Sequence, residues 1–170
     1  AKSEFDTLSI DPQIHDNYLR SSAGYSVITY ILGVGDRHLE NLLLSESGHL
    51  FHVDFTFVFG RDPKPFPPPM KLCKEMVEAM SGVPLKFDGQ QQSYPMEYRK
   101  FKRLCFTGFT LLRRNARELI TSIGLLSHSG TADLSPLATP SDLPTAPQHH
   151  SVELGPHVSR AVLFVQERLM

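Results

Sequence analysis

The chain has 170 residues, of which 41% are apolar, and its formal net charge is −1. This length and apolar share suffice for one modest domain with its own core. The near balance of charges argues against nucleic acid or another polyanion as a general partner. No apolar run is long enough to form a transmembrane segment, so any membrane contact is expected to be peripheral.

The chain contains two cysteines, Cys73 and Cys105. They lack the spacing of metal ligands, and both lie in stretches with helical patterning. We therefore expect reduced, packed thiols, which favours a cytoplasmic location.

The first predicted element is a helix over residues 9–34. Asp11 is placed to cap this helix, and Pro12 suits its first turn. Apolar residues recur at helical spacing along one face: Ile14, Tyr18, Ala23, Val27, Ile28 and Ile31. Gly33 and Gly35 are then expected to end the helix and to let the backbone turn sharply.

Two short strands are predicted next, over residues 41–44 and 49–55, with a turn at residues 45–48 between them. A hairpin of this kind would place Asn41 and Asp54 at the same end of the pair. Both side chains could then face a single metal site.

The second half of the chain is predicted to be mainly helical. Five prolines make residues 60–69 an ordered but irregular loop. Helical periodicity predicts a helix over residues 70–80, stopped at Gly82, and a longer helix over residues 95–123. Residues 127–156 are rich in Ser, Thr, Pro, Gly and His and are expected to be disordered, with one short helix over residues 158–170. The expected fold class is α+β, mainly helical, with a short β-hairpin.

Asp36, Asn41 and Asp54 stand at the spacing that phosphoryl transfer uses. Asn41 lies five residues after Asp36, and Asp54 lies thirteen residues after Asn41. A kinase mainly orients the attacking hydroxyl and holds Mg²⁺ on the phosphates, because the γ-phosphoryl group brings its own electrophilic chemistry. Protein kinases keep this spacing but read His-Arg-Asp, then Asn, then Asp-Phe-Gly. Residues 36–38 read Asp-Arg-His instead, which resembles the phosphatidylinositol 3-/4-kinase superfamily.

Neighbouring stretches narrow this resemblance. Residues 33–44 are similar to the catalytic loop of a phosphatidylinositol 3-kinase. Residues 60–65 and 67–72 resemble the activation segment of the class III catalytic subunit. Several specific motifs in the right order make the match strong, and it extends over roughly residues 14–126.

The resemblance implies a protein-kinase-like C-terminal lobe, the lower lobe of a phosphatidylinositol 3-/4-kinase catalytic domain. We assign this lobe to residues 1–126, with the catalytic loop at 33–44 and the activation loop at 54–72. Residues 127–170 are left as a divergent, disordered tail.

The same resemblance assigns roles to the motif residues. Asp36 would orient the inositol hydroxyl, and either Asp36 or His38 would accept its proton; alternatively, His38 would donate to the transferring phosphoryl group. Arg37 would order the loop through carboxylate or carbonyl contacts. Asn41 and Asp54 would supply oxygen ligands to the Mg²⁺ or Mn²⁺ that accompanies ATP.

Arg61 and Lys64 would reach the phosphate of the lipid headgroup. Two cations interleaved with proline suit unsubstituted phosphatidylinositol, whose headgroup carries one phosphodiester. The alternative for both residues is a solvated surface charge.

The implied activity is ATP-dependent phosphorylation of the 3-hydroxyl of phosphatidylinositol, giving phosphatidylinositol 3-phosphate in endosomal trafficking and autophagy. The implied partners are membrane phosphatidylinositol, a regulatory protein-kinase-like subunit and a beclin-containing complex. The implied location is cytoplasmic and peripheral, on endosomal and autophagic membranes.

Two departures from the family pattern support an alternative, a catalytically inactive fragment that binds regulatory partners if it acts at all. Thr56 stands where the family has the Gly of Asp-Phe-Gly, and a positive φ there would cost a β-branched residue about 1–3 kcal/mol. No phosphate-cradling loop or ATP-anchoring lysine strand is recognisable before Asp36, so the chain alone is expected to be inactive. A protein kinase of the related giant family, which shares Asp-Arg-His, ranks third because it lacks the activation-segment stretches.

Overall fold

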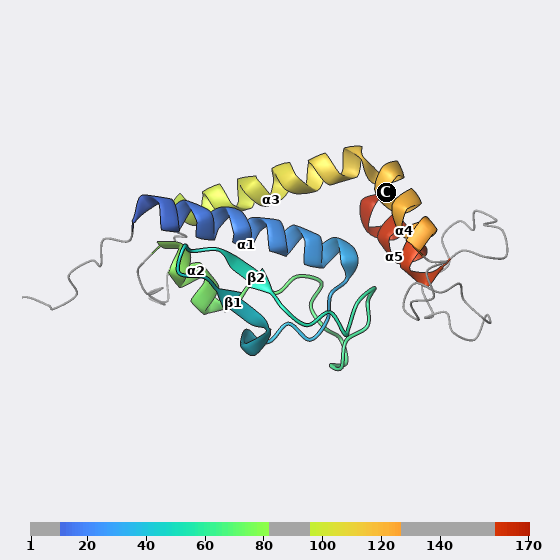
Figure 1. Ribbon diagram of the computed structural model, residues 1–170, viewed down its shortest axis with the longest axis horizontal. Helices are drawn as coiled ribbons and strands as arrows, with labels where there is room; N and C mark the ends of the chain where they lie inside the picture. The colour runs from blue at the N-terminus through green and yellow to red at the C-terminus, as the bar shows by residue number, and fades with distance from the viewer. Residues whose placement is uncertain (1–10, 82–95, 127–158) are drawn as a thin grey trace, which may run out of the picture.

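The computed structural model describes residues 11–81, 96–126 and 159–170. Figure 1 shows the arrangement of its helices and its one hairpin. In chain order the elements are α1 (Pro12–Leu32), the 3₁₀ turn η1 (Leu39–Asn41), β1 (Leu42–Leu44), β2 (Leu50–His52), α2 (Lys74–Ser81), α3 (Met96–Arg114), α4 (Ala116–Leu126) and α5 (Arg160–Leu169). The predicted class, mainly helical with a short hairpin, is confirmed.

The Asp11 cap and the Gly33 stop of α1 form as predicted, although the helix itself, Pro12–Leu32, is shorter than the range 9–34 expected for it. The Asp11 carboxylate accepts a hydrogen bond from the Gln13 amide at 2.7 Å, and a proline occupies the first turn. At the other end Gly33 has φ 57° and ψ 46°, the left-handed conformation that closes many helices. The amide of Val34 donates back to the Thr29 carbonyl at 2.9 Å, which completes the cap and fixes where the chain leaves the helix.

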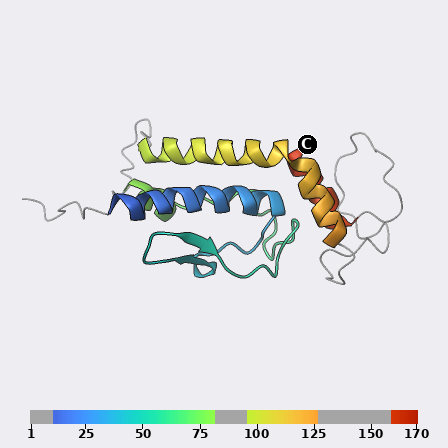
Figure 2. The same cartoon turned by 45° about the horizontal axis from the view of Figure 1, so that its top comes forward.

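The long helix α1 lies between two layers, with α3 along one side and the β1–β2 hairpin along the other (Figure 2). The buried residues of the first core cluster come from all of these elements and from α2: Tyr18, Leu19, Ala23, Leu50, Met76, Met80 and Phe101. Because α1 has neighbours on two sides, it also buries small polar residues such as Ser22, Ser26 and Thr29. The predicted apolar face is therefore partly wrong, since Ile14 and Ile28 are exposed.

The predicted hairpin is present and shorter at both ends. Its strands pair antiparallel, with Leu42 opposite His52 and Leu44 opposite Leu50. Gly48 takes φ 85° in the turn, a conformation that favours glycine. The hairpin is tied to α1 by the Leu50 amide, which donates to the hydroxyl of Ser21 at 2.9 Å.

The helix predicted over residues 95–123 is instead two helices, α3 and α4, which bend at Asn115. The Asn115 side-chain amide donates to the Leu111 carbonyl at 2.8 Å, so it competes with the backbone for that acceptor. The backbone amide of Asn115 is shared between the Leu111 and Leu112 carbonyls at 3.3 and 3.1 Å. This local competition interrupts the regular ladder without changing the apolar period that the sequence shows.

The helix predicted over residues 70–80 begins four residues later, as α2. Its first turn closes where Val77 donates to the Cys73 carbonyl at 3.3 Å. Residues 71–73 have no regular secondary structure. The predicted stop at Gly82 lies outside the described residues.

The helix predicted over residues 158–170 is confirmed as α5, and it packs into the domain. Val165 and Leu169 are fully buried against Val27 and Ile31 of α1 in a second core cluster. Residues 159–170 are therefore part of the packed lobe, in contrast to the tail expected for them. The disorder expected for residues 127–156 falls on residues that the structure does not describe.

Both cysteines are free thiols. Burial raises the pKa of Cys105 to about 11, and its sulfur lies 3.9 Å from the Ala23 carbonyl oxygen. The thiol is therefore protonated and packed, as expected.

Among the helices of the described residues, none combines the length and the apolar character needed to cross a membrane.

Candidate active site

The candidate site begins where α1 ends, because the chain there pairs with the start of the activation segment. The Gly35 amide donates to the Phe57 carbonyl at 2.8 Å, Phe59 donates to the Leu32 carbonyl at 2.7 Å, and Gly60 donates to Gly33 at 3.0 Å. We call these three bonds the joint. The joint fixes residues 57–60 beside residues 32–35, just before the Asp-Arg-His tripeptide.

The backbone of Asp36 sets the course of the catalytic loop. Asp36 has φ 49°, a left-handed conformation that Asp adopts more readily than most residues. Its carbonyl accepts bonds from the His38 amide and from the Asn41 side-chain amide, each at 3.0 Å. The strained residue is thus held by its own loop, and such strain is typical of functional sites.

The structure brings the two candidate bases together. The Asp36 Oδ2 and His38 Nε2 atoms lie 3.6 Å apart, too far for a hydrogen bond but close enough for electrostatic contact. The other ring nitrogen, His38 Nδ1, is 3.8 Å from a carboxylate oxygen of Glu40, which is almost fully exposed. Catalytic hydrogen bonds are often long before substrate binds, so this distance is compatible with either group as the base.

Asn41 and Asp54 lie at the same end of the hairpin, as predicted. The Val53 amide donates to the Asn41 carbonyl at 2.9 Å, so the residue before Asp54 is paired with Asn41. The side-chain nitrogen of Asn41 is committed to the Asp36 carbonyl, which leaves its oxygen, Oδ1, for a metal ion. Neutral amide and carboxylate oxygens are ligands that Mg²⁺ accepts.

Thr56 is bonded to Asp54 in a tight local turn. The hydroxyl and the backbone amide of Thr56 donate to Asp54 Oδ1 at 2.6 and 2.9 Å. These two bonds lower the pKa of Asp54, the side-chain bond most, so the carboxylate stays ionised. Oδ1 is occupied by both donors, and Oδ2 remains for a metal.

The strain expected at Thr56 does not occur. Thr56 is absent from the four non-glycine residues of the described chain that have positive φ, whereas Asp54 itself has φ 69°. The left-handed conformation thus falls on Asp54, where aspartate tolerates it, and Thr56 keeps an ordinary backbone.

Arg37 connects the catalytic loop to the proline-rich part of the activation segment. Its Nη2 donates to the Pro68 carbonyl at 2.6 Å. Its Nε and Nη1 are buried and make no hydrogen bond within the described part of the chain. Burial lowers the pKa of the guanidinium, and the nearby Asp62 carboxylate opposes that effect.

Asp62 contacts the catalytic loop directly, and the sequence analysis gave it no role. Its Oδ2 accepts from the Asp36 amide at 3.1 Å, and its Oδ1 accepts from the Lys64 amide at 2.8 Å. The Asp-Pro-Lys sequence at residues 62–64 is typical of an Asx turn, and this is the signal by which the sequence could have indicated Asp62. A turn signal alone does not reveal that the same carboxylate reaches a residue 26 positions earlier.

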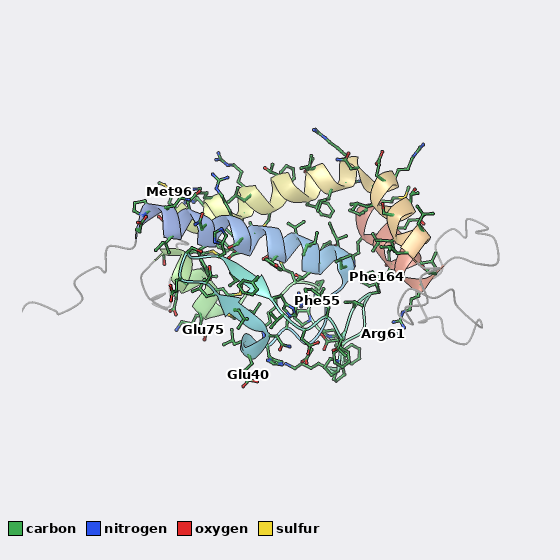
Figure 3. All side chains as sticks on the ribbon, in the orientation of Figure 1. Glu40, Phe55, Arg61, Glu75, Met96 and Phe164 are labelled. Carbon is green, nitrogen blue, oxygen red and sulfur yellow. The ribbon has the colours of Figure 1, made fainter. Side chains whose placement is uncertain are left out.

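The two predicted headgroup cations face different pockets. Lys64 lines a pocket of about 160 Å³ together with Asp36, Arg37, Asp62 and Lys71. Arg61 lines an adjacent pocket of about 140 Å³ with Phe164 of α5. Figure 3 labels both side chains. The geometry therefore places Lys64, and not Arg61, in the pocket that contains Asp36.

His52 is a second residue that the sequence analysis missed. It is only 3% exposed, and neither of its ring nitrogens has a hydrogen-bond partner among the described residues. Burial first, and then the charge of Arg37, lower its pKa. Its ring lies 5.6 Å from that of Phe55, so a neutral imidazole supports the start of the activation segment. The signal that could have identified His52 is its place on the inward side of a strand, two residues before Asp54.

The described helices pack around a β-hairpin. Asp36, Arg37 and His38 lie on the loop before it, and Asn41 and Asp54 lie at its end. This arrangement defines a kinase-type lower lobe. The chain matches the family described as phosphatidylinositol 3- and 4-kinase over residues 3–136. It therefore belongs to the phosphatidylinositol 3- and 4-kinase family.

Three relatives illustrate the similarity within this family. Phosphatidylinositol 3-kinase VPS34 of Arabidopsis thaliana is 51% identical over 120 residues, which is 71% of this chain and 14% of the relative. Phosphatidylinositol 3-kinase pik3 of Schizosaccharomyces pombe is 49% identical over 125 residues, 74% of this chain and 14% of the relative. Phosphatidylinositol 3-kinase catalytic subunit type 3 of Caenorhabditis elegans is 49% identical over 126 residues, 74% of this chain and 13% of the relative. The chain thus spans about a seventh of the length of these proteins.

Proposed function

We propose that this chain supplies the catalytic loop and activation segment of an ATP-dependent lipid kinase that phosphorylates the 3-hydroxyl of phosphatidylinositol. The observation that carries the proposal is the placement of the Asp36 carboxylate 3.6 Å from the His38 imidazole in a loop braced by Asn41. The names of the relatives, all phosphatidylinositol 3-kinases, support the choice of substrate and product.

The roles of the loop residues follow from their contacts. Asp36 orients the attacking hydroxyl, and Asp36 or His38 accepts its proton. Either group can lie beside the same hydroxyl, because the Asp36 Oδ2 and His38 Nε2 atoms are 3.6 Å apart. Arg37 acts indirectly, because its bond to the Pro68 carbonyl sets the distance between the loop and the activation segment.

Asn41 and Asp54 are the residues that would bind Mg²⁺ or Mn²⁺ with ATP. The chemistry of the donors fits, since each side chain keeps one oxygen clear of the hydrogen bonds that orient it. A bound divalent ion would neutralise charge on the phosphates. The lowered pKa of Asp54 keeps its carboxylate available as an ionised ligand at neutral pH.

Lys64 is the better placed of the two cations for the headgroup phosphodiester. It shares its pocket with Asp36, so a phosphate near Lys64 would lie on the same side of the loop as the candidate base. Arg61 would act from the adjacent pocket.

The wider assignments also belong to this proposal. They are peripheral contact with endosomal and autophagic membranes, a regulatory protein-kinase-like subunit and a beclin-containing complex as partners. The inactive alternative loses one of its supports, because Thr56 has no positive φ and instead orients Asp54.

The test is phosphatidylinositol phosphorylation with Mg²⁺- or Mn²⁺-ATP, by the chain alone and by the chain joined to the upper lobe of the Arabidopsis relative. We expect turnover in the joined protein and none in the chain alone. Asp54→Asn should abolish turnover, whereas Asp11→Asn, which changes only the α1 cap, should not. A folded joined protein without turnover would contradict the proposal and favour the inactive alternative.

A further inference from the structure

The geometry points to Phe164 of α5 as a positioning residue that holds the activation segment against the catalytic loop. The Phe164 ring lies on two glycines that meet at the joint, Gly33 and Gly60. Nothing in the motifs of residues 33–72 indicates a partner about a hundred residues further along the chain.

The fit depends on the missing Cβ atoms of both glycines. A Cβ on Gly33 would overlap ring atoms of Phe164, and a Cβ on Gly60 would lie 2.6 Å from Phe164 Cε2. Contacts below 3 Å cannot be accommodated without displacement, so the ring occupies space that only glycine leaves. Both glycines also have positive φ, 57° and 79°, so each is required for two independent reasons.

The position of the Phe164 ring is fixed by the packing of α5, the helix that carries it. Val165 and Leu169 are fully buried in the second core cluster, which fixes the helix on α1. The Arg168 guanidinium lies 5.0 Å from the Phe164 ring centroid and 4.5 Å from that of Tyr30, in cation–π geometry. Phe164 therefore projects from a rigid element.

The consequence for the site follows from chain connectivity. Asp62 is two residues beyond Gly60, and its carboxylate reaches the Asp36 amide only while Gly60 stays at the joint. Phe164 thus acts on Asp36 through Gly60 and Asp62. Its effect on turnover rests on the proposed function, but its effect on the joint does not.

Amide hydrogen exchange of the whole chain tests the joint without any reaction. Phe164→Ala should speed exchange at the Gly35, Phe59 and Gly60 amides on the order of tenfold, the effect of losing about 1.4 kcal/mol. The Val53 amide, which bonds within the hairpin end, should keep its rate. The matched control is Val165→Ala, a neighbour buried in the core, which should speed the slow amides together and not the joint alone.

A double-mutant cycle with Gly60→Ala gives a second, independent test. The added methyl meets the ring in the parent chain but not in Phe164→Ala, so Gly60→Ala should lower the urea midpoint less in the second background. Additive midpoints, or joint amides that accelerate no more than the rest, would overturn the inference. In the joined kinase, Phe164→Ala should lower turnover, whereas Glu167→Ala, a change at an exposed position of the same helix, should not. An inactive parent would count against the proposed function and leave the exchange result standing.

Discussion

The catalytic loop, residues 33–44, and the activation segment, residues 54–72, meet at the candidate site but are fixed in different ways. In the loop, the Asp36 carbonyl collects bonds from residues two and five positions later. The activation segment makes local turns at Asp54 and Asp62. Its position relative to the loop depends instead on distant groups.

Those groups come from the end of α1, from the catalytic loop and from α5. Leu32 and Gly33 accept bonds from the segment, Arg37 donates to Pro68, and Phe164 covers Gly60. A short local motif can therefore specify the loop, whereas the segment needs the assembled fold. The comparison predicts that changes at the contact between the two regions are the most damaging.

Gly35→Ala should have the largest effect, because a methyl there would overlap the Arg61 carbonyl and lie 3.0 Å from the Asp62 Cα. Backbone cannot move aside as a side chain can, so we expect about 1–3 kcal/mol of destabilisation. Turnover of the joined kinase should fall on the order of a hundredfold, as a 1 Å misplacement can cause. Urea unfolding and initial rates measure the two effects.

Gly24→Ala is the matched control within α1. A Cβ on Gly24 meets nothing within 4 Å, so the substitution should stabilise the helix by roughly 0.5–1 kcal/mol. If Gly35→Ala and Gly24→Ala unfold at the same urea concentration, the close approach of the activation segment is not a property of the protein.

Asp62→Ala should rank second, because it removes the acceptor for the Asp36 and Lys64 amides together. One hydrogen bond contributes about 0.5–1.5 kcal/mol, so we expect roughly 1–2 kcal/mol of lost stability. Faster exchange of the Asp36 amide would locate the change, and Asp62→Asn should show a smaller effect because it keeps one acceptor oxygen. An Asp36 amide whose exchange is unchanged in Asp62→Ala would argue against the link.

Much of the fold could be predicted because its signals are local. The Asp11 cap, the apolar period of α1 and the turn at residues 45–48 each act within a few residues. The break at Asn115 was missed because a side chain competes for one carbonyl without altering the apolar period. The exposure of Ile14 and Ile28 depends on which neighbours α1 acquires, and periodicity does not report that.

The candidate site divides in the same way. The spacing of Asp36, Asn41 and Asp54 predicted that the loop and hairpin end converge. The contributions of Asp62 and Phe164 depend on approaches across 26 and about 100 residues, for which one sequence carries no periodic signal. Their detection requires the assembled fold.

His52 provides a pH-dependent test of how the activation segment is held, because it supports that segment from inside the hairpin. Its folded-state pKa is lowered, so below the ordinary value near 6.5 the unfolded chain binds a proton that the folded chain resists. Stability should therefore fall as the pH drops below about 6.5. His52→Gln should flatten this slope in urea midpoints measured from pH 7.5 to 5.5. His49→Gln, a change at an exposed histidine, should not, and equal slopes in the two variants would rule His52 out.

The smallest effect is expected at Asp16, which joins α1 to α3 away from the site. Lys100 at 2.6 Å and then Arg20 at 2.5 Å lower its pKa to about 2. Because the pKa of Asp16 is lower in the folded chain, its ionised carboxylate stabilises the fold at pH values above the unfolded pKa of 3.8. This contribution is lost as the pH falls from about 4 towards 2. Asp16→Asn should weaken the acid dependence in that window, as followed by circular dichroism, and should leave exchange at the joint amides unchanged. Faster exchange of the Gly60 amide in Asp16→Asn would show that the contact between α1 and α3 is coupled to the activation segment, and would contradict their independence.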